Sequence, residues 1–238
     1  MTPYNYPKRG FTVIPLRDSV RPRTTPFINW ILIALNIYIF IREIMIPPGE
    51  LNVVFYNMGL IPSNVTHLVL SGSPLDVSMI TFITAIFLHG GWMHVLSNML
   101  FLWVFGDNVE DRLGHLKYLF FYLAVGVAGS IAHIISSPFS EVPVIGASGA
   151  VAGVLGAYFV AFPRARVLTL IPIIIFFTIV EIPAVIFLAL WFVLQIFNGT
   201  ASLGGSADAV AWWAHVGGFL TGIFLIKTMS PRKNLSVY

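Results

Sequence analysis

The sequence predicts an all-α membrane protein, a bundle of six membrane-spanning helices. Of the 238 residues, 57% are hydrophobic and only 10% are charged, whereas soluble domains carry about a quarter charged residues. The apolar residues are gathered in stretches close to the roughly 20 residues that a helix needs to cross a bilayer. Lysine and arginine also occur in every second connection between the apolar stretches, so that six crossings would put nearly all of them on one side of the membrane.

The six expected spans end at prolines or at polar residues. They cover residues 27–46, 92–105, 116–136, 146–162, 179–197 and 209–228. The apolar run at 79–88 is expected to lie in the membrane interface. The stretch 171–197 is too long for one span and contains Pro172 and Pro183. Because proline interrupts helices, residues 167–177 are expected to be a membrane-associated connector.

Basic residues indicate the orientation, because they collect on the cytoplasmic side. With six spans, all 13 lysines and arginines except Arg42 fall on one side. The opposite loops contain only acidic charges, at Glu50, Asp76, Glu141 and Asp208. We therefore expect a multi-pass protein of the plasma or inner membrane, with cytoplasmic tails at 1–26 and 229–238 flanking a membrane domain at 27–228. The polar first 26 residues predict no removable signal peptide.

Composition and motifs exclude several kinds of site. The chain has no cysteine, which rules out disulfides, thiolate metal sites and a cysteine nucleophile. The net charge of +3 without a basic block argues against nucleic acid. The metalloprotease pattern His-Glu-x-x-His is absent from the sequence, and no two spans carry an aspartate as an aspartyl protease would require.

Polar side chains within the apolar segments are costly in a bilayer and therefore indicate function. They are His89, His94 and Asn98 in HGGWMHVLSN, Ser148 in GASGAVAG, His215 in AHVGGFLTG, and Glu110 in GDNVEDRLG. Of these, His94, Ser148 and His215 each lie roughly 18 to 22 Å from the cytoplasmic end of their helix, from the helical rise. The three side chains are therefore expected at one level, about 10 Å below the outer surface of the hydrocarbon core.

Small residues would let the helices of Ser148 and His215 pack in direct contact, because such residues allow membrane helices to approach closely. The expected stripes are Ser148, Ala152 and Gly156 with Gly149 and Gly153 beside them, and His215, Gly218 and Gly222. A serine is a poor nucleophile until a base takes its proton, and His215 is the candidate base. Ser148 follows Gly146 at a helix start, where free N–H groups favour an oxyanion. No acidic residue is expected at this depth, which predicts a dyad rather than a triad.

These motifs resemble the rhomboid family of intramembrane serine proteases, over about residues 27–228. The resemblance implies a catalytic Ser148, a general base at His215, and oxyanion donors at His94, Asn98 and the Ser148 N–H. It also implies a six-helix core without metal or cofactor, and single-span membrane substrates cut near the outer face. The remaining candidates are expected to support the structure or the cavity: His89, Gly146, Gly149, Gly218, Gly222 and Glu110.

The sequence departs from the family pattern at two places. Ile80 and Thr81 occupy positions where rhomboids often carry Trp-Arg. Ala152 occupies a position where many carry an aromatic that stacks on the catalytic histidine, so Phe219 or Trp213 is expected to support the His215 ring instead.

Two other functions were weighed. One is a non-catalytic rhomboid-like protein that binds transmembrane helices. The other is a transporter, which the lack of charges in the outer halves of the helices and of paired broken helices argues against. Taken alone, a serine in a Gly/Ala-rich helix is usually a packing residue, and Glu110 is more simply structural. The sequence leaves the substrate and the oligomeric state open.

Overall fold

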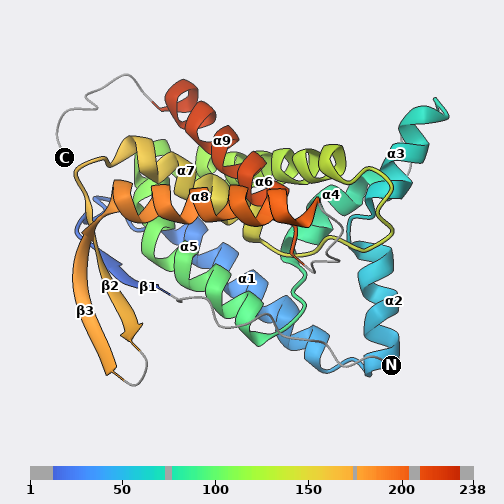
Figure 1. Cartoon of the computed structure of the whole chain (residues 1–238), viewed down its shortest axis with the longest axis horizontal. Coiled ribbons are helices and arrows are strands. Elements are labelled where there is room, and N and C mark those ends of the chain that lie inside the picture. Colours follow the sequence, from blue (N-terminus) through green and yellow to red (C-terminus); the bar gives the residue numbers. More distant parts are fainter. Residues whose placement is uncertain (1–12, 73–76, 174–175, 204–209, 231–238) are drawn as a thin grey trace.

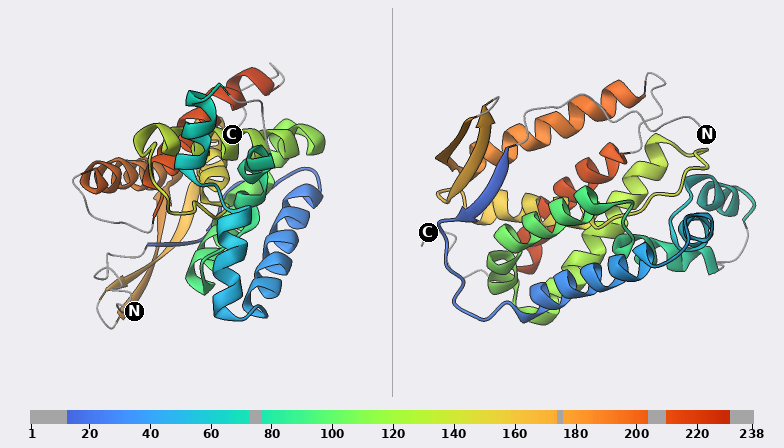
Figure 2. Two further views of the ribbon diagram at one scale, coloured as in Figure 1. Left: turned by 90° about the vertical axis from the view of Figure 1, so that its right-hand side faces the viewer. Right: turned by 90° about the horizontal axis from the view of Figure 1, so that it is seen from below.

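The computed structural model of the chain describes residues 13–72, 77–173, 176–203 and 210–230. The helices form a bundle with a small β-sheet at one end and the helices α2 and α3 at the opposite end (Figures 1 and 2). Several predictions fall outside the described residues. They concern tail residues 1–12 and 231–238, the start of the sixth span, and the outer-loop acids Asp76 and Asp208.

The described chain is mostly helical, and most predicted spans coincide with one helix each. The long helices are α1 (Phe27–Ile44), α5 (Trp92–Leu113), α6 (His115–Ser136), α7 (Ser148–Ala161), α8 (Ala184–Ser202) and α9 (Trp212–Met229). The second span was predicted too short, because α5 continues through the polar segment after Phe105 to Leu113. Within this polar segment Glu110 is fully buried, and its carboxylate accepts a hydrogen bond from the backbone N–H of Asn29.

By length and hydropathy, α1, α6 and α8 qualify as membrane spans. A fourth span is obtained if Thr81–Phe87 and α5, which are bent by 94° to one another, count as one. The helix α7 is apolar but has only 14 residues. The described part of this membrane protein therefore has three or four candidate spans, and the count of six stays a prediction.

Between α1 and α5 the chain forms a series of short helices, and the interfacial position expected for residues 79–88 stays a prediction. They are α2 (Pro48–Met58), α3 (Pro62–Leu70), η1 (Val77–Ile80), α4 (Thr81–Thr84) and η2 (Ala85–Phe87). Leu60 and Val144 exchange backbone hydrogen bonds of 3.0 and 2.8 Å, which join this segment to the loop before α7.

A three-stranded β-sheet, which was not predicted from the sequence, lies beside the helices. Its strands β1 (Ile14–Asp18), β2 (Arg166–Ile173) and β3 (Phe176–Pro183) are antiparallel in the order β1-β2-β3. The predicted connector is thus a β-hairpin, the fifth span begins at Ala184 rather than at 179, and the N-terminal tail contributes a strand. The apolar run is rich in Val, Ile, Thr and Phe, which favour strands.

The sheet also accommodates residues that fit a span poorly. Glu181 lies in β3 and pairs with Arg166 of β2 at 3.1 Å, on an exposed surface. Pro172 lies beyond Leu170, the last residue of β2 that pairs with β1. A proline is tolerated there because β2 has become an edge strand on that side.

The centre of the bundle is α7. Nearly all of its residues are buried, and it contacts α5, α6, α8 and α9. Its Gly- and Ala-rich sequence explains this position, because small side chains let four neighbours approach one helix axis.

Candidate active site

The helices α7 and α9 touch backbone to backbone. A Cβ added to Gly218 would collide with the carbonyl oxygen of Gly149, and one added to Gly222 would collide with that of Gly153. A Cβ on Gly156 would meet the Phe219 carbonyl in the same way. The predicted contact between the two small-residue stripes is therefore present. It sets Ser148, which precedes Gly149, beside the turn of α9 that carries His215.

Ser148 is the first residue of α7 and is partly exposed. The N–H groups of a first helical turn have no partner within the helix, so the serine stands beside free donors. His215 is buried, with 8% of its surface exposed. Among the described residues, the hydrogen-bond partner of the His215 ring is Gln195 rather than Ser148. The two residues are thus each next in sequence to, or one turn from, the glycine contact between α7 and α9, and no hydrogen bond is found between them.

The loop before Ser148 is shaped around His94. Gly146 has a φ of +121°, a region that side chains other than glycine rarely adopt. A Cβ there would lie 2.5 Å from Nε2 of His94. The glycine thus permits the turn and lets the His94 ring lie against the backbone two residues before the serine.

Asn98 lies one helical turn after His94 on α5 and is 6% exposed. Its Nδ2 is buried and has no hydrogen-bond partner in the described part of the chain. An amide donor left unpaired in a low-dielectric interior is unfavourable by about 1–3 kcal/mol. A group retained at that cost is suited to bind an incoming acceptor such as a carbonyl oxygen.

His89 is held as part of a rigid loop. It is 1% exposed, and its ring meets the His94 ring edge-on with centroids 5.1 Å apart. Its backbone N–H donates to both carboxylate oxygens of Glu43, each at 3.2 Å, and its Nδ1 lies 3.3 Å from the Phe87 carbonyl oxygen. Glu43, a buried residue near the C-terminal end of α1, was not anticipated. In the orientation predicted from the basic residues, this charged residue lies in the outer half of its helix, where none was expected.

The support of the His215 ring differs from the sequence-based expectation. Gln195 of α8 approaches Nδ1 at 2.8 Å. Trp191 lies 6.0 Å away between ring centroids, and Trp212 meets the ring edge-on at 5.9 Å. Phe219 instead stacks on Phe192. Trp213, the other residue expected beside His215, donates its indole N–H to the Gly199 carbonyl oxygen. These two residues are therefore not the ring's partners, and Ala152 is fully buried in α7.

Glu110 is a structural residue at the opposite end of α5. Its carboxylate accepts hydrogen bonds from the backbone N–H groups of Ile28 at 3.1 Å and Asn29 at 2.7 Å. Nδ1 of His115 lies 2.5 Å from Oε1 of Glu110. The carboxylate therefore fastens the start of α1 to α5 and α6.

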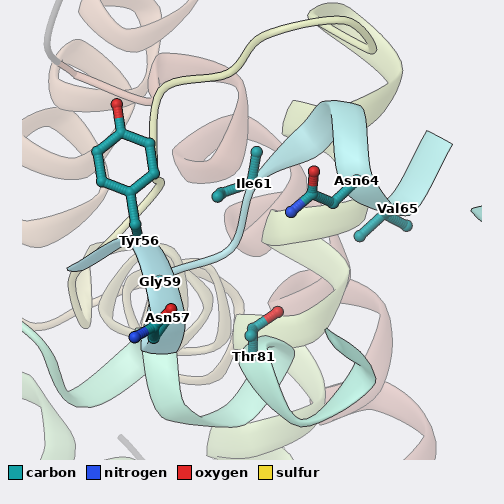
Figure 3. A pocket seen from close by; sticks show the side chains of 7 residues that line it. All are labelled: Tyr56, Asn57, Gly59, Ile61, Asn64, Val65 and Thr81. Carbon is teal, nitrogen blue, oxygen red and sulfur yellow. The ribbon is translucent and has the colours of Figure 1, made fainter. Parts of the chain in front are cut away.

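A separate hollow of about 190 Å³ lies between α2, α3 and α4 (Figure 3). It is lined by Tyr56, Asn57, Gly59, Ile61, Asn64, Val65 and Thr81. None of the predicted site residues lines it. Within the described residues, no group of three or more histidines, aspartates or glutamates is placed to hold a metal ion.

The fold and this site define a polytopic helical membrane protein with a serine and a histidine on adjoining helices. Residues 76–232 match the Rhomboid domain family. The chain therefore belongs to the rhomboid family, which confirms the resemblance of its motifs.

Individual relatives are similar over parts of their length. A stretch of 75 residues is 47% identical to Rhomboid protease GluP of Bacillus subtilis (strain 168), covering 32% of this chain and 14% of that protein. A stretch of 173 residues is 33% identical to RHOMBOID-like protein 4 of Arabidopsis thaliana, covering 69% of this chain and 39% of that protein. Rhomboid protein 1, mitochondrial, of Saccharomyces cerevisiae is 33% identical over 150 residues, with 61% and 40% covered. The matched region thus spans less than half of each relative.

Proposed function

We propose that this protein is an intramembrane serine endopeptidase that hydrolyses peptide bonds in or near transmembrane segments of other membrane proteins. Ser148 is the nucleophile and His215 the general base. The observation that carries the proposal is the contact between Gly149 and Gly218. It places the start of α7 against the turn of α9 that holds the histidine. The relatives that are named rhomboid proteases support the same activity.

In the proposed reaction, His215 Nε2 takes the Ser148 hydroxyl proton while Oγ attacks the substrate carbonyl carbon. The tetrahedral intermediate collapses as the protonated histidine gives its proton to the leaving amine. A water molecule, with His215 again as base, then hydrolyses the acyl-serine ester and restores the enzyme.

The oxyanion of each intermediate is bound by groups already in place. These are the free N–H groups at the start of α7, the unpaired Nδ2 of Asn98, and the His94 ring beside Gly146. Donors fixed before the reaction stabilise developing charge without having to reorganise. We assign His89 and the glycines to support of this cavity, and we propose that the chemistry requires no metal or cofactor.

The proposed setting is the plasma or inner membrane, with six spans and both termini in the cytoplasm. The substrates are single-span proteins cut near the outer face. The basic residues Arg164 and Arg166 follow α7 at the end opposite Ser148, so this orientation puts the serine toward the outer side.

The test is cleavage of a single-span substrate by the full chain reconstituted in lipid vesicles. Ser148→Ala and His215→Ala each abolish cleavage. Ser71→Ala and His67→Ala, the same changes at exposed positions on α3 and its C-terminal cap, retain it. Full cleavage by either site variant would refute the dyad. If wild-type protein neither cleaves nor reacts with a serine-directed probe, and Ser148→Ala co-purifies with the same transmembrane partners, the protein is a non-catalytic binder of membrane helices.

A further inference from the structure

Gln195 is a buried amide on an otherwise apolar helix. It is 6% exposed and shares the buried stripe of α8 with Leu188 and Gly199. The opposite face of α8 is exposed and apolar, at Leu190, Val193, Leu194 and Phe197. A polar side chain in such a segment is unfavourable unless both ends of it are hydrogen-bonded. Apolar packing therefore does not explain why a glutamine occurs at position 195.

Both ends of the amide are hydrogen-bonded. Nε2 donates to the carbonyl oxygen of Trp191, one turn earlier on α8, at 3.0 Å. A carbonyl oxygen only accepts hydrogen bonds, so the nitrogen end of the amide must face it. The other end, Oε1, then faces Nδ1 of His215 at 2.8 Å.

This geometry fixes the proton on the histidine. Since Oε1 only accepts, Nδ1 of His215 must carry the hydrogen, and in a neutral imidazole the lone pair is then on Nε2. Nε2 is the atom that the reaction proposed above uses to take the serine proton. Trp191 and Trp212 border the same ring and restrict its tilt.

We infer that Gln195 is a positioning residue that holds His215 in the catalytically competent tautomer and orientation. It takes the orienting part that the acid plays in a Ser-His-Asp triad, but without a charge. It also provides the support that Ala152 cannot give. The inference rests on the proposed hydrolase function. It means that the position of α8, which carries Gln195, controls whether His215 is held ready to act as the base.

The experiment compares wild type with Gln195→Met, which has similar length but lacks the amide acceptor, and with Gln195→Glu, which restores an acceptor oxygen. Leu194→Met, on the exposed face of the same helix, is the matched control. The full chain is labelled with ¹⁵N-histidine in lipid nanodiscs, and the His215 signals are assigned by their loss in His215→Asn. Cleavage kinetics are measured on the same samples.

In wild type and Gln195→Glu, His215 shows one tautomer with the hydrogen on Nδ1, and Gln195→Met shows a mixture of both. The kcat of Gln195→Met falls about tenfold at unchanged KM, a factor that corresponds to one neutral hydrogen bond of about 1.4 kcal/mol. An Nε2–H tautomer in wild type, or a full kcat in Gln195→Met, overturns the inference. If wild type cleaves nothing, the proposed function fails, but the tautomer measurement still decides whether Gln195 orients His215.

Discussion

Gly218→Ala is the substitution that most directly perturbs the contact between α7 and α9. The added Cβ would collide with the Gly149 carbonyl oxygen, which is backbone and cannot rotate away. The added carbon would lie 2.1 Å from that oxygen, and ordinary van der Waals contact begins at 3.4 Å, so the helices must separate by about 1.3 Å. Overpacking of this kind is unfavourable by about 1–3 kcal/mol, and a 1 Å misplacement of reacting groups lowers a rate about a hundredfold.

The assay is cleavage of a single-span substrate in vesicles, together with thermal unfolding of the same samples. Gly218→Ala retains its fold with a lower midpoint and loses about a hundredfold in kcat. Gly222→Ala, against the Gly153 carbonyl farther from the serine, loses similar stability but less activity. Gly49→Ala, where an added Cβ meets nothing within 4 Å, changes neither. Full activity in Gly218→Ala would refute the idea that this contact sets the distance between Ser148 and His215.

Three further predictions concern single polar groups. Asn98→Val lowers kcat about 10²- to 10³-fold while the unfolding temperature stays the same or rises, because the substitution removes a buried donor that has no partner; marked destabilisation would make Asn98 structural. Glu110→Ala lowers the free energy of unfolding by about 2 kcal/mol or more, because it leaves the buried N–H of Asn29 and the half-buried N–H of Ile28 unpaired; an unchanged unfolding curve would contradict this. Burial raises the pKa of Asp18 in β1 to about 6, so the folded state binds this proton more tightly than the unfolded chain does. The stabilisation that comes from this tighter proton binding at Asp18 is fully present below about pH 4 and is lost as the pH rises through about 6. A difference in the free energy of unfolding between wild type and Asp18→Asn that does not vary with pH would contradict this.

The helices and the site motifs could be predicted because their signals are local. An apolar run between polar ends marks a helix without knowledge of its neighbours, as at 116–136, where α6 spans His115–Ser136. The facing glycines were predictable for a similar reason. Helical spacing alone puts Gly218 and Gly222 on one face, and small residues on one face indicate a close neighbour.

The sheet could not be predicted in this way because strand pairing joins distant segments. Leu170 pairs with Ile14, far away in the sequence, and a fully apolar strand has the same composition as part of a membrane helix. A signal was nevertheless present. Glu181 was placed inside a predicted span, where an unpaired charge is costly, and this favoured a structure outside the bilayer.

Gln195 and Glu43 were missed, although the rule that found His94 and Asn98 applies to them as well. Each is a polar residue within or at the end of an apolar run, but neither belongs to a motif. Their partners are also set by tertiary packing, because Gln195 reaches His215 on another helix and Glu43 reaches the backbone of His89. The group at Nδ1 of His215 is an amide, and the acid-free dyad stays a prediction.

The central claim is that Ser148 is a nucleophile activated by His215. The most direct measurement is mass spectrometry of the vesicle-embedded chain after reaction with a fluorophosphonate, which forms a stable adduct only with an activated serine. The account predicts one adduct, on Ser148, that is absent in Ser148→Ala and strongly reduced in His215→Ala. An unmodified Ser148 in protein that cleaves its substrate, or equal labelling in His215→Ala, would contradict it.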